Sequence, residues 1–221
     1  MTSRNMSGSQ NQQPPTLGLV LAGGLARRMG GGDKALLKIG HETILDRVLA
    51  RLTPHCERVI LNANGDPERF SRFGLPVVAD EIPDFAGPLA GILAGLDWAA
   101  EHARGIDWVA SVPGDCPFVP RDLVPRLHAA RVETGQKLAC ARSGEWRHPV
   151  IGLWPIALRD DLRRALTEEG LHKIEVWTGR YGVAIVEWPE RPVDPFFNIN
   201  RPEDLAEAER IAVRDQGGMI A

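Results

Sequence analysis

The sequence predicts an α/β fold, a single-domain Rossmann-like three-layer sandwich with a mostly parallel central sheet. Short apolar runs typical of strands alternate with longer segments whose apolar residues recur at helical spacing. The chain has 221 residues, enough for one large domain whose core needs no disulfide. The expected strands are residues 17–21, 58–62, 75–80, 108–112, 150–154 and 183–186.

Helices are expected between most of these strands. In segment 43–52, apolar residues fall on one face, while Asp46, Arg47 and Arg51 lie between them, so this helix is amphipathic. Similar segments are 88–102, 121–132 and 155–167. Strand and helix alternation of this kind favours parallel strands covered by helices on both faces.

Composition limits the classes of function. The formal net charge of −3 and the pI near 6.1 argue against a nucleic-acid or membrane partner, which would require a sustained basic surface. Cys56, Cys116 and Cys140 are far apart and show no Cys-x-x-Cys spacing, so neither a disulfide framework nor a zinc site is indicated. No apolar run approaches the ~20 residues that span a bilayer. We expect a protein of the reducing cytoplasm.

A glycine-rich loop follows the first expected strand. Segment 21–34 reads Leu-Ala-Gly-Gly-Leu-Ala-Arg-Arg-Met-Gly-Gly-Gly-Asp-Lys, so uncrowded backbone N–H groups lie beside Arg28 and Lys34. Such a loop can hold a triphosphate. The spacing matches neither a Walker loop nor a dinucleotide fingerprint. A flexible loop with solvated basic residues is the alternative.

Polar residues recur where the expected strands end. Asn62 and Asn64 end the second strand, Asp80 ends the third, and Asp115 follows the fourth. Each alone also fits an ordinary turn. Ligands of open α/β sheets bind outside the carboxyl ends of the strands, so together these residues predict one polar pocket there.

Asp115 lies in Val-Pro-Gly-Asp-Cys-Pro, a turn held by two prolines after an apolar strand. A rigid carboxylate there suits Mg²⁺, which commonly combines one or two protein carboxylates with substrate phosphates. With Arg28 and Lys34 neutralising the outer phosphates, an anionic acceptor could attack the α-phosphorus and expel pyrophosphate. The predicted reaction is nucleotidyl transfer, with Arg28, Lys34 and Asp115 as catalytic residues.

Three further positions have two interpretations each. Cys116 is expected to be a buried thiol rather than a nucleophile, because no histidine is near it in sequence. His148 precedes a proline and is either a substrate contact or a turn residue. Asn200 is expected to cap a helix that starts at Arg201, with Glu203 as its capping-box partner, while Asn198 is free to bind ligand.

The order of these motifs resembles the molybdenum cofactor guanylyltransferases, which join the GMP part of GTP to molybdopterin and release pyrophosphate with Mg²⁺. The likeness covers almost the whole chain after the N-terminal segment. Its motifs are Leu-Ala-Gly-Gly at 21–24, Arg-Arg-Met-Gly at 27–30, Asp-Lys at 33–34, Asn-Ala-Asn at 62–64, Asp80, Gly-Pro-Leu-Ala-Gly at 87–91, Asp-Cys-Pro at 115–117, His-Pro at 148–149, Asn-Ile-Asn at 198–200 and Pro-Glu at 202–203.

The resemblance implies roles for the site residues. It places Asp115 against both GTP and Mg²⁺, and Arg28 nearer the phosphates or the pterin. Further GTP contacts are implied for Leu21, Ala22, Gly23, Lys34, Asn62 and Asp80, and further phosphate or pterin contacts for His148, Asn198 and Asn200. Cys116 departs from the family, where relatives often carry threonine, and this leaves the arrangement around the metal open.

The composition of residues 1–15, rich in Ser, Asn, Gln and Pro, indicates the organisation at the N-terminus, and the resemblance implies the partners. We expect a disordered N-terminal tail at 1–15, a nucleotidyltransferase domain at 16–214 and a C-terminal tail at 215–221. GTP and molybdopterin would be the substrates, with transient contacts to pterin-delivering proteins and to apo-molybdoenzymes.

Two alternatives remain. One is a cytidylyl or sugar-phosphate nucleotidyltransferase of the same superfamily, against which Gly23 and segment 87–91 argue, because cytidylyl relatives typically read Leu-Ala-Ala-Gly in the loop. The other is a non-catalytic nucleotide-binding or cofactor-binding protein, which would be expected to lose Asp115 or Lys34.

Overall fold

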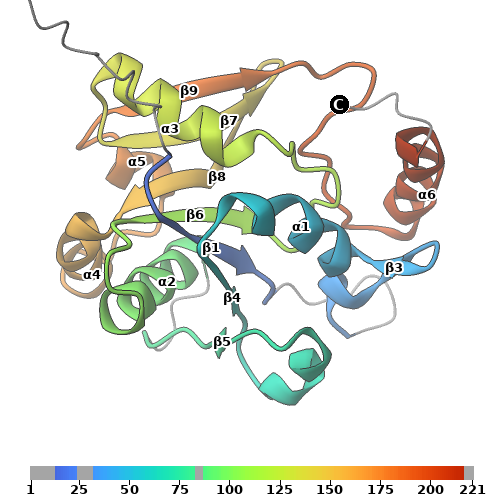
Figure 1. The fold of residues 1–221 in the computed structure, drawn as a ribbon. Helices are drawn as coiled ribbons and strands as arrows, with labels where there is room; N and C mark the ends of the chain where they lie inside the picture. Colours follow the sequence, from blue (N-terminus) through green and yellow to red (C-terminus); the bar gives the residue numbers. More distant parts are fainter. Residues whose placement is uncertain (1–12, 24–31, 83–86, 217–221) are drawn as a thin grey trace, which may run out of the picture.

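The computed structural model of the chain describes residues 13–23, 32–82 and 87–216. Its centre is a seven-stranded sheet with the order β5-β4-β1-β6-β8-β7-β9 (Figure 1). The strands are β1 (Thr16–Leu21), β4 (Arg58–Asn62), β5 (Val77–Val78), β6 (Trp108–Pro113), β7 (Leu138–Ser143), β8 (Trp146–Pro155) and β9 (Val183–Trp188). Strand β8 is antiparallel to both β6 and β7, and the other pairings are parallel. The prediction of a mostly parallel sheet is therefore confirmed.

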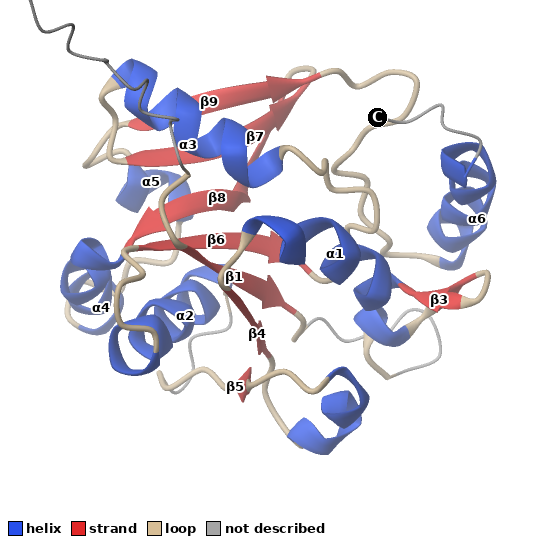
Figure 2. Cartoon of the chain, in the orientation of Figure 1, coloured by secondary structure: helices blue, strands red, loops and turns tan. Residues whose placement is uncertain are grey.

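Helices cover both faces of this sheet, as Figure 2 shows. They are α1 (Ile44–Leu52), α2 (Pro88–His102), α3 (Leu123–Thr134), α4 (Arg159–Thr167), α5 (Ile174–Thr178) and α6 (Pro202–Gln216). Helices α1, α3 and α6 contribute to one hydrophobic core, and α2, α4 and α5 contribute to the other. The two cores and the sheet between them form the three layers that the sequence predicts.

Short elements complete the chain. They are the ribbon of β2 (Lys38–Ile39) and β3 (Glu42–Thr43), and the 3₁₀ segments η2 (Lys34–Leu36), η3 (Thr53–His55), η4 (Pro67–Phe73) and η5 (Ile156–Leu158). Helix α6 packs beside this ribbon, at the right of Figure 1. In the described part of the chain, no helix has the length and apolarity needed to cross a membrane.

Helix α1 shows how local sequence sets an element boundary. The Thr43 hydroxyl accepts the Asp46 backbone N–H at 3.1 Å, and the Asp46 carboxylate accepts the Thr43 N–H at 2.8 Å. This capping box satisfies two backbone donors of the first turn. The apolar face behind it, including Leu45 and Val48, is fully buried. The predicted helix 43–52 is confirmed.

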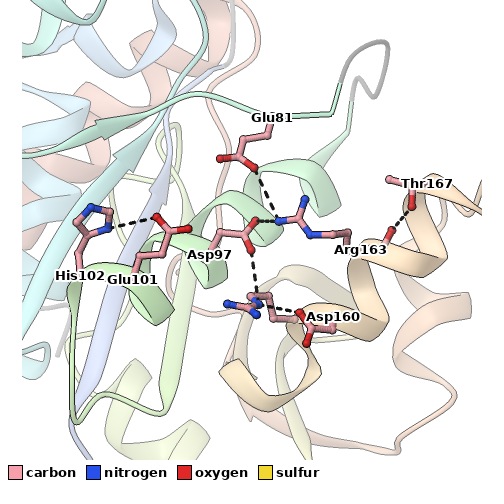
Figure 3. A network of polar contacts seen from close by, with 8 residues as sticks. Glu81, Asp97, Glu101, His102, Asp160, Arg163 and Thr167 are labelled. Carbon is pink, nitrogen blue, oxygen red and sulfur yellow. Dashed lines mark hydrogen bonds and ion pairs between the residues drawn. The ribbon is translucent and has the colours of Figure 1, made fainter.

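Helices α2 and α4 are joined by ion pairs that include a largely buried carboxylate. In Figure 3, Arg163 of α4 lies between Asp97 of α2 and Glu81. Its Nη2 is 2.6 Å from Asp97 Oδ2, and Arg159 Nε is 3.7 Å from Asp97 Oδ1. These contacts fix the packing of α4 on α2, on the face opposite α1.

Some predicted elements differ from the structure. The expected parallel strand 150–154 is part of the longer antiparallel β8, which pairs with β7, a strand absent from the prediction. A tight turn at Gly144, with φ of +52°, joins these two strands and reverses the chain. The expected strand 75–80 is reduced to Val77–Val78, and α6 continues to Gln216, two residues into the predicted tail.

Candidate active site

The carboxyl ends of the parallel strands open into one polar cavity of about 510 Å³. Strands β1, β4 and β6 supply its floor, because their chain exits are adjacent in the sheet. The residues lining it are Leu21, Ala22, Gly23, Lys34, Ala35, Asn62, Asn64, Asp80, Gly87, Pro88, Pro113, Gly114, Asp115, Val150 and Asn198. The strand exits that the sequence singles out are therefore brought together.

Backbone hydrogen bonds continue the sheet into this cavity. The Ala22 N–H donates to the Asn62 carbonyl at 2.8 Å, and the Gly114 N–H donates to the Leu21 carbonyl at 2.9 Å. Gly23, in the glycine-rich loop, is the last residue described before segment 24–31. Predicted residues Gly24, Arg27, Arg28 and Met29 lie outside the described residues, so their predicted roles stay predictions.

One wall of the cavity is a hydrogen-bonded group formed by Asn62, Asn64 and Asp80. The two carboxylate oxygens of Asp80 accept the amide groups of Asn62 at 2.9 Å and of Asn64 at 2.8 Å. The Asn64 side-chain oxygen accepts the Asp80 backbone N–H at 2.8 Å. This arrangement fixes the orientation of both amides, and it presents polar groups suited to a sugar or base.

Gly91 allows helix α2 to approach this wall. A Cβ at Gly91 would lie well inside van der Waals contact with Asn62 Oδ1 and Leu21 Cδ2. Any side chain there would displace the asparagine that binds Asp80. Steric crowding therefore explains why glycine ends the predicted motif 87–91. Gly87 and Pro88, at the start of this motif, line the cavity directly.

The cavity is also lined by the charged pair Lys34 and Asp115. Lys34 Nζ lies 3.5 Å from Asp115 Oδ2, and the two side chains are 17% and 20% exposed. Burial raises the pKa of the Asp115 carboxyl above its usual value, and the Lys34 ammonium opposes that shift. The pair thus combines a carboxylate that can hold a metal with a cation that can hold phosphate.

Asn200 binds Lys34 instead of capping a helix. Its side-chain oxygen accepts a hydrogen bond from Lys34 Nζ at 2.5 Å. The Asp204 carboxylate accepts the N–H groups of Asn200 and Arg201, both at 2.8 Å, and α6 begins at Pro202. The predicted Asn200 and Glu203 capping box is therefore wrong, because the charged Asp204 accepts the terminal N–H groups and the lysine holds the asparagine.

Cys116 and Asn198 meet behind Asp115. The Cys116 thiol is fully buried and hydrogen-bonded to the Asn198 side-chain oxygen, and the Ile199 N–H donates to the Asp115 carbonyl at 3.1 Å. Burial raises the pKa of the Cys116 thiol well above its usual value, which makes it a poor nucleophile. The expectation of a buried thiol is confirmed, and the thiol helps to dock segment 196–200 at the site.

His148 lies outside the cavity lining. Its Nε2 is in a 2.8 Å hydrogen bond with the Ser143 hydroxyl, and its ring centroid is 4.7 Å from that of Phe196. Burial lowers its pKa, so the ring is neutral near pH 7. Val150, which the sequence did not single out, lines the cavity instead. In the sequence, the only feature that could have indicated a cavity position for Val150 is that it directly follows the His-Pro pair at 148–149.

A comparison with known protein families gives a match that agrees with this fold and cavity. The model of the MobA-like NTP transferase domain matches residues 18–184, about three quarters of the chain. The chain belongs to this family. The ion-paired Lys34 and Asp115 both line its sheet-edge cavity, which is the candidate site.

Curated relatives narrow the family further. The chain is 62% identical to the molybdenum cofactor guanylyltransferase of Nitrobacter hamburgensis, over 92% of this chain and 98% of the relative. It is 58% identical to the protein of that name from Rhodopseudomonas palustris, over 91% and 96% of the two chains. The protein is therefore an enzyme of the molybdenum cofactor guanylyltransferase family.

Solved structures share the fold. Molybdopterin-guanine dinucleotide biosynthesis protein A of Archaeoglobus fulgidus has a TM-score of 0.69 at 24% identity and covers 90% of this chain and 99% of its own. The 2-C-methyl-D-erythritol 4-phosphate cytidylyltransferase of Thermus thermophilus reaches 0.62 at 22% identity, covering 89% and 98%. Since guanylyl and cytidylyl enzymes share the architecture, the fold alone does not determine which base is bound.

Proposed function

We propose that the protein transfers GMP from GTP to molybdopterin, releases pyrophosphate and forms the guanine dinucleotide cofactor. The observation that carries this proposal is that one cavity is lined both by the Lys34 and Asp115 ion pair and by the hydrogen-bonded group of Asn62, Asn64 and Asp80. A nucleoside triphosphate needs both kinds of group, a cation for its phosphates and hydrogen-bonding side chains for its nucleoside. The two relatives described above are named molybdenum cofactor guanylyltransferases, and that name supports a guanylyl donor and a molybdenum cofactor acceptor.

The residues fit a divalent metal. Asp115 offers hard carboxylate oxygens, is largely buried, and has Lys34 at 3.5 Å as the nearby cation. Within the described ranges no group of three or more His, Cys, Asp or Glu is arranged to hold a metal. Asp115 would therefore hold Mg²⁺ together with substrate phosphates. When bound, Mg²⁺ supplies charge neutralisation of the phosphate oxygens. A solved structural relative, Rv0371C of Mycobacterium tuberculosis, is a complex with manganese.

The chain's own residues then bind and orient the substrates. Lys34, held by Asn200, neutralises charge on the phosphates, and the backbone around Ala22 and Gly23 approaches the nucleotide without side-chain crowding. Asn198, on the same rim, faces the acceptor side. An acceptor phosphate monoester is already anionic at neutral pH, so no general base is required. Catalysis consists mainly of positioning and charge compensation.

The remaining assignments belong to the same proposal. Arg28 would contact phosphates, and His148 would act on the acceptor side through the segment that contains Phe196. The proposed location is the cytoplasm. Transient partners would be the proteins that deliver the pterin and the apo-molybdoenzymes that receive the product.

The test is pyrophosphate release from purified protein with molybdopterin, Mg²⁺ and one nucleotide at a time. We expect turnover with GTP and none with CTP or ATP. Turnover with CTP but not GTP would establish the cytidylyl alternative. Binding of GTP without pyrophosphate release, under the same conditions, would instead establish a non-catalytic binding protein.

A further inference from the structure

Arg69 contacts two segments of the cavity wall that are far apart in the sequence. It lies on η4, and its Nε is 2.8 Å from Asp33 Oδ2 in an ion pair. Its Nη2 donates to the Asn64 carbonyl at 2.6 Å, and its Nη1 donates to the Asp66 carbonyl at 2.7 Å. One guanidinium therefore joins the base of the glycine-rich loop to the turn after β4.

Both contacted segments carry site residues. Asp33 directly precedes Lys34, the residue that faces Asp115. Asn64 lines the cavity and binds Asp80 through its side chain. Any shift of Asp33 or of the Asn64 backbone is thus transmitted to one end of the site.

Asp33 depends on this arginine. Its side chain is 9% exposed, and its Oδ1 has no hydrogen-bond partner among the residues that the structure describes. Among the described residues, Arg69 supplies its ion pair. A buried carboxylate that loses its cation moves toward solvent or takes up a proton. Loss of Arg69 would therefore displace Asp33, and Lys34 with it.

The turn after β4 is shaped around the guanidinium. Gly65 has φ of +86°, and a Cβ there would lie 3.1 Å from Arg69 Nη1. This positive φ brings the carbonyls of Asn64 and Asp66 onto the same side chain. The planar fork of arginine donates hydrogen bonds to both carbonyls while its charge pairs with Asp33, whereas lysine offers a single charge centre.

We propose that Arg69 is a positioning residue that sets the spacing between the phosphate end of the site, at Lys34, and the nucleoside end, at Asn64 and Asp80. This role rests on the proposed function, because it assumes that one nucleoside triphosphate contacts both Lys34 and the group of Asn64 and Asp80. Arg69 itself is absent from the cavity lining. It acts through Asp33 and through the backbone of the turn.

Arg72 provides a matched control on the same 3₁₀ segment. Its Nη2 is 2.6 Å from Asp46 Oδ2, and its guanidinium lies 4.2 Å from the Phe73 ring centroid, as that of Arg69 lies 4.9 Å from Phe70. Arg72 thus has a similar set of contacts, but it reaches the start of α1 instead of the site.

The experiment measures GTP affinity by calorimetry in wild type, Arg69→Gln, Arg69→Lys and Arg72→Gln. We expect Arg69→Gln to weaken GTP binding about tenfold, as for the loss of charged hydrogen bonds. Arg69→Lys should recover part of that loss by pairing with Asp33, and Arg72→Gln should bind as wild type does. Equal affinity of Arg69→Gln and Arg72→Gln would overturn the proposal.

A ligand-free readout separates this proposal from the proposed function. Backbone hydrogen exchange should accelerate at residues 32–37 and 62–66 in Arg69→Gln but not in Arg72→Gln. In the first segment, the backbone carbonyls of Asp33 and Lys34 accept the N–H groups of Leu36 and Leu37, so a displaced Asp33 would expose these N–H groups. Unchanged exchange in both segments would overturn the positioning role. If wild type does not bind GTP while exchange responds as expected, the proposed nucleotide fails and the link between the two segments stands.

Discussion

Asp115 and Asp97 are both largely buried carboxylates, with side chains 20% and 10% exposed, and burial raises the pKa of each. They differ in their surroundings. Asp97, on α2, faces α4 and has Arg163 at 2.6 Å, as Figure 3 shows. Arg159 of α4 lies 3.7 Å from it. Asp115 faces the cavity, where Lys34 is 3.5 Å away. A carboxylate enclosed by arginines joins helices, whereas one that faces a cavity, with Lys34 as its ion-pair partner among the described residues, can hold a metal ion.

The largest expected effect follows from removing the charge at the cavity. Asp115→Asn should lower the rate of pyrophosphate release about 10³-fold, since the proposed metal and phosphate site loses its carboxylate. The melting temperature should not fall, because the buried charge itself is unfavourable there. Steady-state kinetics and thermal unfolding check both parts. Full activity in Asp115→Asn would show that Asp115, like Asp97, is not needed for the reaction.

The next effect is steric and lies at the nucleoside end. Gly91→Ala places a methyl group against Asn62 Oδ1 and Leu21 and should displace the amide that binds Asp80. We expect a loss of GTP affinity of about thirtyfold. Gly95→Ala is the control, because its added methyl meets Leu19, a core residue of the same helix contact that does not line the cavity. If both variants bind GTP equally weakly, the helix packing and not the Asn62 contact is responsible.

At Asp97 the consequence should be stability instead of activity. Arg163→Met leaves Asp97 with less compensation and should lower the free energy of unfolding by about 2 kcal/mol at pH 7, with activity within about twofold of wild type. The contact of Arg163 with Glu81, at 3.8 Å and with Glu81 64% exposed, contributes little. Since the pKa of Asp97 is raised, the loss should shrink as the pH falls and the carboxyl is protonated. Denaturant unfolding at two pH values tests this.

The smallest expected effect comes from His128, a second ionisable group remote from the site. It is buried, bonded to the Thr16 hydroxyl at 2.8 Å, and burial lowers its pKa to about 4. The unfolded chain takes up this proton near its usual pKa of about 6.5. Stability is therefore present above that value and is lost as the pH falls toward 4. From pH 7.5 to 5.5 the loss should be about 1 kcal/mol. His128→Phe should abolish that part of the pH dependence.

Much of the site was predictable because it depends on local chain exits. The ends of β1, β4, β5 and β6 follow from apolar runs and from the rule that ligands bind at the carboxyl edge, so Asn62, Asp80 and Asp115 were found by position alone. Lys34 was found through the basic loop. The sheet itself followed from the alternation of strands and helices.

What escaped prediction depends on contacts between distant segments. Asn200 looked like a helix cap, and only the fold brings Lys34 within 2.5 Å of it. Arg69 sits in an unremarkable polar segment, and nothing in its neighbours indicates that Asp33 is close. The direction of β8 was also missed, because an antiparallel strand buried on both faces has the same apolar pattern as a parallel one.

The central claim is that Asp115 binds a divalent metal together with the nucleotide. Its most direct test is the affinity for GTP, measured by calorimetry with and without Mg²⁺, in wild type, Asp115→Asn and Arg163→Met. The account predicts that Mg²⁺ tightens GTP binding in wild type and in Arg163→Met, and that this gain disappears in Asp115→Asn. An equal gain in Asp115→Asn and wild type would contradict it.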